Sequence, residues 1–129
     1  MIEVPAELEE RLQNWGRWCR PNKVRGRSSL LPIMREMGVA DTTASAPINV
    51  RDAEYVSARW RQMPFAAYED RKIKLLLAYA YTYGVNSSTI LRLIRKEHKV
   101  RIQSSEYDRL LEEGIRRLGK KLGYVVNYV

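Results

Sequence analysis

Apolar residues recur at helical spacing through most of the chain, and this pattern predicts a mainly α-helical protein. Between Pro5 and Arg20 the apolar stripe is Leu8, Leu12, Trp15 and Cys19. Steps of four, three and four residues place these side chains on one helical face. Pro5 suits a first turn, and Pro21 ends the helix because proline cannot donate the next backbone hydrogen bond. Cys19 therefore reads as a small apolar residue of the buried face.

The same spacing predicts four further helical segments or parts of segments. Asp52 is expected to cap a helix that runs to about Met63. Next, a helix begins at Ala66 or Ala67 and ends at Tyr83, where Gly84 stops it. A shorter helix spans residues 89–96, and the last spans about 106–122, with Ser105 and Asp108 resembling a capping box. We therefore expect a small helical domain of four to five helices, with no sheet larger than two short strands.

Residues 21–49 read as a connection with little regular structure. The connection opens with the basic residues Lys23, Arg25 and Arg27 and contains a short apolar piece, residues 30–34. The basic residues suit either a phosphate contact or a solvated loop. The apolar tail, residues 124–129, is expected to cover the core, add a strand or bind a partner. We divide the chain into an N-terminal part, 1–63, and a C-terminal part, 64–129, which together form one compact body.

The net charge of the protein is confined to its C-terminal half. Residues 1–70 hold ten Lys and Arg and ten Asp and Glu, whereas residues 71–129 hold thirteen against five. The formal charge of +8 of the 129-residue chain therefore lies wholly in the second half. A basic half beside a neutral one is typical of a surface that binds DNA or RNA, although a charge that merely aids solubility would look the same.

Two consecutive helices joined by a short connection, the second capped and basic, predict a C-terminal helix-turn-helix. The first turns of the last helix would then enter the major groove of DNA. The candidates for reading bases are Ser104, Ser105, Glu106 and Arg109. The candidates for contacting phosphates are Arg92, Arg95, Lys96, Lys99, Arg101, Arg116 and Lys120.

Several short motifs resemble a known family. Residues 76–84, 90–94, 107–111 and 115–118 resemble the last, DNA-reading domain of bacterial sigma factors and its relatives, the phage antitermination Q proteins. Residues 12–18, Leu-Gln-Asn-Trp-Gly-Arg-Trp, resemble the start of one branch of that family. The resemblance implies a transcription antiterminator that binds DNA near a phage late promoter and engages RNA polymerase, often together with a sigma factor.

The chain departs from that family pattern at two points. The connection His98–Gln103 is longer than the usual turn of three or four residues, so we expect its tip to form a small wing or a separate contact. The chain has one Cys, so the cysteine cluster of some antiterminators is missing and no zinc is carried over.

Other function classes receive less support from the sequence. A phosphate-binding loop, metal-ligand spacing and a nucleophile–base pair are all missing, so we expect neither an enzyme nor a cofactor. Without a signal peptide or a long apolar stretch, the sequence predicts a cytoplasmic protein of the bacterial host cell that does not contact membrane. A conventional helix-turn-helix repressor or activator and a basic adaptor for RNA or protein remain open, as does the oligomeric state.

Overall fold

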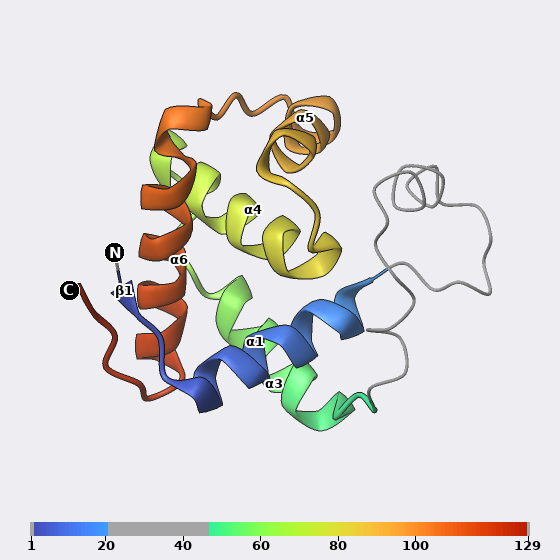
Figure 1. The fold of residues 1–129 in the computed structure, drawn as a ribbon, viewed down its shortest axis with the longest axis vertical. Helices are drawn as coiled ribbons and strands as arrows, with labels where there is room; N and C mark the ends of the chain where they lie inside the picture. The colour runs from blue at the N-terminus through green and yellow to red at the C-terminus, as the bar shows by residue number, and fades with distance from the viewer. Residues whose placement is uncertain (1, 21–46, 129) are drawn as a thin grey trace.

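The computed structural model describes residues 2–20 and 47–128. The predicted basic run at Lys23, Arg25 and Arg27, and the short apolar piece at residues 30–34, lie outside the described residues. Over the described ranges the protein is mainly helical, as the apolar spacing predicted (Figure 1). The α-helices are α1 (Ala6–Cys19), α3 (Val50–Arg61), α4 (Tyr68–Tyr83), α5 (Ser87–His98) and α6 (Tyr107–Lys121). The shorter elements are β1 (Ile2–Glu3), the 3-10 helix η3 (Ser104–Glu106) and β2 (Asn127–Tyr128).

Helix α4 is the centre of the fold. It packs against α1, α5 and α6, while α3 packs on the other side of α1 (Figure 1). Apolar positions on all sides of α4 explain this placement, because Leu76 and Leu77 are both completely buried. Burial of a whole Leu or Ile side chain contributes about 1.5–3 kcal/mol, and α4 buries Ile73 and Leu75 in addition to these two leucines.

Helices α1 and α4 approach each other closely at Gly16. A Cβ atom at this position would lie 1.9 Å from the carbonyl oxygen of Tyr81, closer than atoms can approach. Just beside this crossing, Trp15 is 1% exposed and its ring centroid lies 5.9 Å from that of Trp60 on α3. The Trp-Gly pair in the sequence therefore supplies a large core side chain and a gap for a neighbouring helix.

The cap of α3 differs from the sequence prediction. Asn49, and not Asp52, is the N-cap: its side-chain oxygen accepts a hydrogen bond from the backbone N–H of Asp52 at 3.1 Å. The Asp52 carboxylate instead forms an ion pair with Arg11 of α1 at 2.9 Å. Asn14 fixes Asn49 in place through two hydrogen bonds to its backbone, of 2.9 and 2.8 Å. The prediction was wrong because Arg11 and Asn14, distant in sequence, decide which residue caps the helix.

The C-terminal tail covers the core and also adds a strand. Val126 is 6% exposed and packs against Gly119 of α6, and Tyr128 pairs with Ile2 in the antiparallel sheet of β1 and β2. Two of the three roles expected for the tail therefore occur together, and both termini lie along α6 (Figure 1). No helix in the described ranges is both long and apolar enough to cross a membrane.

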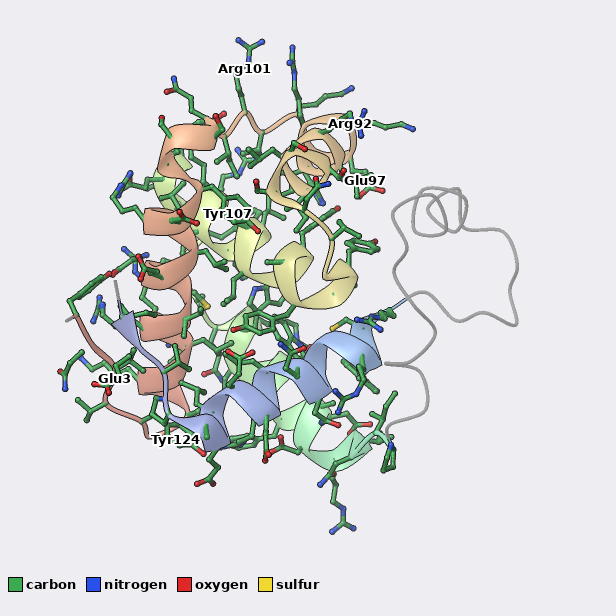
Figure 2. All side chains as sticks on the ribbon, in the orientation of Figure 1. Glu3, Arg92, Glu97, Arg101, Tyr107 and Tyr124 are labelled. Atoms are coloured by element: carbon green, nitrogen blue, oxygen red, sulfur yellow. The ribbon has the colours of Figure 1, made fainter. Side chains whose placement is uncertain are left out.

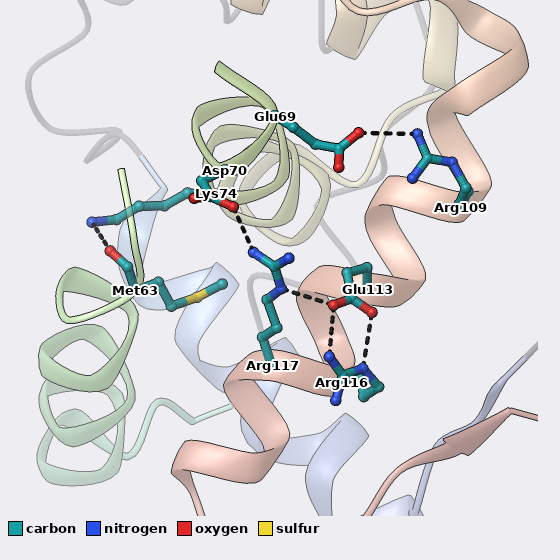
Figure 3. A network of polar contacts seen from close by, with 8 residues as sticks. All are labelled: Met63, Glu69, Asp70, Lys74, Arg109, Glu113, Arg116 and Arg117. Carbon is teal, nitrogen blue, oxygen red and sulfur yellow. Dashed lines mark hydrogen bonds and ion pairs between the residues drawn. The ribbon is translucent and has the colours of Figure 1, made fainter. Parts of the chain in front are cut away.

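A carboxylate of α6 ties the tail to the helix and should make stability depend on pH. Glu113 accepts hydrogen bonds from Arg116 at 2.7 and 2.8 Å and from Arg117 at 2.8 Å (Figure 3). It also accepts one from the Tyr128 hydroxyl at 2.8 Å. The hydrogen bonds from Arg116 are the largest cause that lowers the pKa of Glu113, and burial acts in the opposite direction. Together with the other contacts they lower this pKa from 4.5 to about 2.

Because the folded-state pKa is lowered, Glu113 stabilises the protein above about pH 4.5, and this contribution is lost as the pH falls toward 2. We expect Glu113→Gln to destabilise the protein by about 1–2 kcal/mol at pH 7, since partial exposure weakens the ion pairs. The difference from wild type should shrink as the pH falls from 4.5 to 2. Urea unfolding across this range measures it, and a difference independent of pH would contradict the assignment.

Candidate nucleic-acid interface

Helix α5 turns its basic residues away from the protein because its other face is apolar. The Asn86 side chain caps the helix by accepting a hydrogen bond from the Thr89 N–H at 3.0 Å. Ile90, Leu93 and Ile94 are buried in the core. At 100° per residue, this burial leaves Arg92, Arg95 and Lys96 on the exposed face. Cations in the last turn also interact favourably with the helix dipole.

The connection from α5 to α6 alternates between buried and exposed residues. Val100 is 1% exposed and Ile102 is 7% exposed. Lys99, which precedes Val100, and Arg101, which lies between the two apolar residues, are exposed to solvent. Lys99 ends α5 in the left-handed region, with φ of 60°. The connection forms no strand, so the first of the two expected outcomes, a small wing, is not present. The connection is anchored by two apolar side chains and makes a separate contact, from the Arg101 N–H to the Tyr68 hydroxyl of α4.

Five of the predicted phosphate-contacting residues surround one open hollow of about 480 Å³. These are Arg92, Arg95, Lys96, Lys99 and Arg101, and we call their surface the basic hollow. In Figure 2, Arg101 extends from the connection away from the body of the protein, at the edge where Arg92 also lies. Within the described part of the chain, none of the five forms an ion pair with a carboxylate. The basic hollow therefore gathers five cations without an ion-paired carboxylate among the described residues.

The carboxylate on α5 is engaged with another group. Glu97 accepts a hydrogen bond from the Tyr79 hydroxyl of α4, and His98 Nε2 lies 2.9 Å from the same hydroxyl. The His98 and Tyr79 rings also pack edge to face, with their centroids 5.6 Å apart. Glu97 is thus held against α4 and is not paired with the cations of the basic hollow.

The other two predicted phosphate contacts, Arg116 and Lys120, lie apart from the basic hollow. Arg116 binds both carboxylate oxygens of Glu113 (Figure 3). Lys120 is exposed near the C-terminal end of α6. From Arg109 to Arg116 a helix rises about 10 Å, so these side chains cannot join a cluster formed around the connection. The predicted set therefore divides into five residues together and two elsewhere.

The four predicted base-reading residues lie in η3 and the first turn of α6, and they differ in exposure and in their contacts. Ser104 and Ser105 are exposed in η3. Arg109 is also exposed and forms an ion pair with Glu69 of α4 at 3.3 Å (Figure 3). Glu106 is engaged: it accepts a hydrogen bond from the Gln103 N–H at 3.1 Å and pairs with Lys72 at 3.2 Å.

The capping box at this helix start is formed by Gln103 and Glu106, not by Ser105 and Asp108 as the sequence suggested. The helix begins with a 3-10 turn two residues earlier than expected, which moves the reciprocal hydrogen bonds to the earlier pair. The hydrogen bond from the Gln103 N–H is the largest cause of the lowered pKa of the Glu106 carboxyl group. Glu106 thus supports the turn, while Ser104, Ser105 and Arg109 remain the exposed predicted residues.

Two residues that the sequence did not single out support this surface from α4. Lys72 contributes the ion pair to Glu106, and the Tyr68 hydroxyl accepts a hydrogen bond from the Arg101 N–H at 3.0 Å. Both contacts join residues more than thirty positions apart. Charge and periodicity carry no signal for such contacts, since they depend on how α4 lies against the connection.

The left-handed backbone conformation of Lys99 is expected to lower the stability of the protein. A residue with a side chain in the left-handed region is strained by about 1–2 kcal/mol, which glycine avoids. We expect Lys99→Gly to raise the free energy of unfolding by about 0.5–1 kcal/mol, as the relief exceeds the entropic cost of glycine. Urea unfolding checks this value. A decrease in stability would show that the Lys99 side chain supports the fold instead.

The single cysteine of the protein, Cys19, lies on α1. Burial raises the pKa of the Cys19 thiol to about 11, which keeps it protonated and unreactive at neutral pH. Cys19 packs against the core, in agreement with its position in the apolar stripe of α1. Among the described residues, no group of three His, Cys, Asp or Glu side chains is placed to hold a metal ion.

Comparisons of the chain with protein-family models, with curated proteins and with solved structures found no match.

Proposed function

We propose that the protein binds double-stranded DNA, with α5, the connection and α6 acting as a helix-turn-helix. The observation that carries the proposal is the basic hollow, where five cations converge without an ion-paired carboxylate among the described residues. Such a cluster suits the phosphate backbone, because phosphate contacts supply most of the affinity of DNA-binding proteins and fix their orientation. Sequence would be read next to it by Ser104, Ser105 and Arg109 at the start of α6.

The proposal extends to transcription. The resemblance of the chain to phage antitermination Q proteins favours a factor that binds beside a late promoter and engages RNA polymerase, with or without a sigma factor, in the bacterial cytoplasm. A factor that binds DNA and also engages RNA polymerase needs both a DNA surface and a protein surface. The basic hollow lies at the edge formed by α5 and the connection, whereas α1 and α3 lie at the opposite end of the described fold (Figure 1).

A read-through assay tests the transcriptional role. The template carries a phage late promoter followed by a terminator, and the measured quantity is the fraction of transcripts that pass the terminator. Antitermination predicts more read-through with the protein, provided that the promoter-proximal binding site is present. Polymerase-independent binding to a palindromic site would support a conventional repressor or activator, and binding that ignores DNA sequence would support a basic adaptor.

Arg109 provides the test of base reading. We expect Arg109→Ala to weaken binding to a duplex selected from a random pool by about 1–3 kcal/mol, with little effect on a scrambled duplex. The reason is its exposed position in the first turn of α6, where it has only two surface ion pairs to exchange among the described residues, with Glu69 at 3.3 Å and with Glu106 at 3.9 Å. Titrations of both duplexes at matched salt measure the effect. Equal losses on the two duplexes would place Arg109 on phosphate and refute its assigned role.

A further inference from the structure

The connection between α5 and α6 is held by the first two turns of α4. The Tyr68 hydroxyl accepts a hydrogen bond from the Arg101 N–H at 3.0 Å and lies 3.5 Å from the Arg101 carbonyl oxygen. One turn further along α4, Lys72 Nζ lies 3.2 and 3.4 Å from the two carboxylate oxygens of Glu106. The same ammonium lies 5.1 Å from the centroid of the Tyr68 ring. Tyr68 and Lys72 thus form one unit, which we call the α4 clamp.

Each contact of the α4 clamp acts on a residue next to the proposed DNA-binding surface. Tyr68 holds the backbone of Arg101, whose side chain lines the basic hollow. Lys72 holds Glu106, which in turn accepts the Gln103 N–H and closes the capping box at the start of α6. The clamp therefore acts at both ends of the segment that joins the phosphate-binding residues to the base-reading residues.

We propose that Tyr68 and Lys72 are positioning residues that fix the distance between the basic hollow and the first turn of α6. This proposal rests on the proposed DNA-binding function and adds to it the part of the fold that sets its geometry. Phosphates along a DNA strand have a fixed spacing relative to the base edges, so a surface that contacts both gains affinity when its two parts are held in place before binding. The buried side chains of Val100 and Ile102 anchor the segment to the core, and the α4 clamp holds its ends.

Tyr68→Phe tests the proposal, because it removes the hydroxyl without removing charge or ring. In the free protein, the Arg101 amide should exchange with solvent about 3- to 10-fold faster, the range expected for the loss of one hydrogen bond. Affinity for duplex DNA should fall by a similar factor, and the slope of log affinity against log salt should stay the same, because no cation is lost.

Tyr55→Phe is the matched control. Tyr55 lies on α3 and is 45% exposed, close to the 49% of Tyr68, and its hydroxyl has no hydrogen-bond partner among the described residues. This variant should match wild type in amide exchange, in affinity and in salt slope.

The possible failures of the proposal are distinct. Unchanged exchange at Arg101, with weaker DNA binding, would mean that Tyr68 contacts DNA directly. Faster exchange with unchanged affinity would show that the α4 clamp forms but positions nothing that DNA requires. A shallower salt slope in Tyr68→Phe would point to a lost phosphate contact and would also overturn the proposal. If wild-type protein does not bind duplex DNA at all, the proposed function itself fails, and the exchange measurement still reports whether the clamp exists.

Discussion

Gly16→Ala should destabilise the protein by about 3 kcal/mol or more, the largest effect expected for a single methyl group in the described core. The added Cβ would lie 1.9 Å from the Tyr81 carbonyl oxygen and 2.5 Å from its carbonyl carbon, so α1 and α4 would have to separate. Backbone atoms cannot move aside as a flexible side chain can. The gain in helix propensity from glycine to alanine, about 1 kcal/mol, is too small to offset this clash.

Gly114→Ala is the control for this prediction. Gly114 lies on α6 against α4, but its added Cβ would meet the side chains of Leu77 at 3.2 Å and Ile73 at 3.3 Å. A shift of a few tenths of an ångström relieves such contacts, and the higher helix propensity of alanine compensates for part of the cost. Urea unfolding of both variants should therefore show a much larger loss at Gly16. Similar losses at the two positions would contradict the described crossing of α1 and α4.

The largest effect on function is expected from reversing two charges in the basic hollow. Arg95→Glu combined with Lys96→Glu changes the local charge by four units at two exposed positions that form no ion pair with a described carboxylate. We expect the affinity for duplex DNA to fall on the order of 100-fold at physiological salt, through lost phosphate contacts and added repulsion. Stability should change little, because both side chains face solvent.

The matched control reverses the same amount of charge elsewhere on the protein. Lys120→Glu combined with Lys121→Glu alters two exposed lysines near the C-terminal end of α6, away from the basic hollow. This double variant has the same net charge as the first and should lose much less affinity. Equal losses in the two double variants, measured by fluorescence anisotropy, would mean that net charge alone determines binding.

The sequence predicted the helices well, because burial of an apolar face determines where a helix forms. The stripe Leu8, Leu12, Trp15 and Cys19 corresponds to α1, and the exposed face opposite Ile90 and Ile94 collects the cations of α5. The five cations lie together because three of them share the exposed face of α5 and the other two are in the connection that directly follows it. The separate placement of Arg116 and Lys120 follows from the length of α6.

Helix ends and supporting contacts were less predictable, since partners far away in sequence determine them. Asp52 was expected to be a cap, but Arg11 binds its carboxylate and Asn49 takes the N-cap position. The sequence also did not indicate that Glu106, a predicted base-reading residue, would form an ion pair with Lys72 of another helix. The left-handed conformation of Lys99 was also unexpected, because glycine is the residue that usually signals such an end.

The salt dependence of duplex binding tests the central claim most directly. If the five cations of the basic hollow each neutralise one phosphate, log affinity should fall against log salt with a slope of about −4.5. Arg95→Ala and Lys99→Ala should each reduce the size of that slope by about one unit, whereas Lys120→Ala should leave it unchanged. A flat response of the wild-type protein to salt, or equal slopes for all three variants, would contradict the assignment of the basic hollow to DNA phosphates.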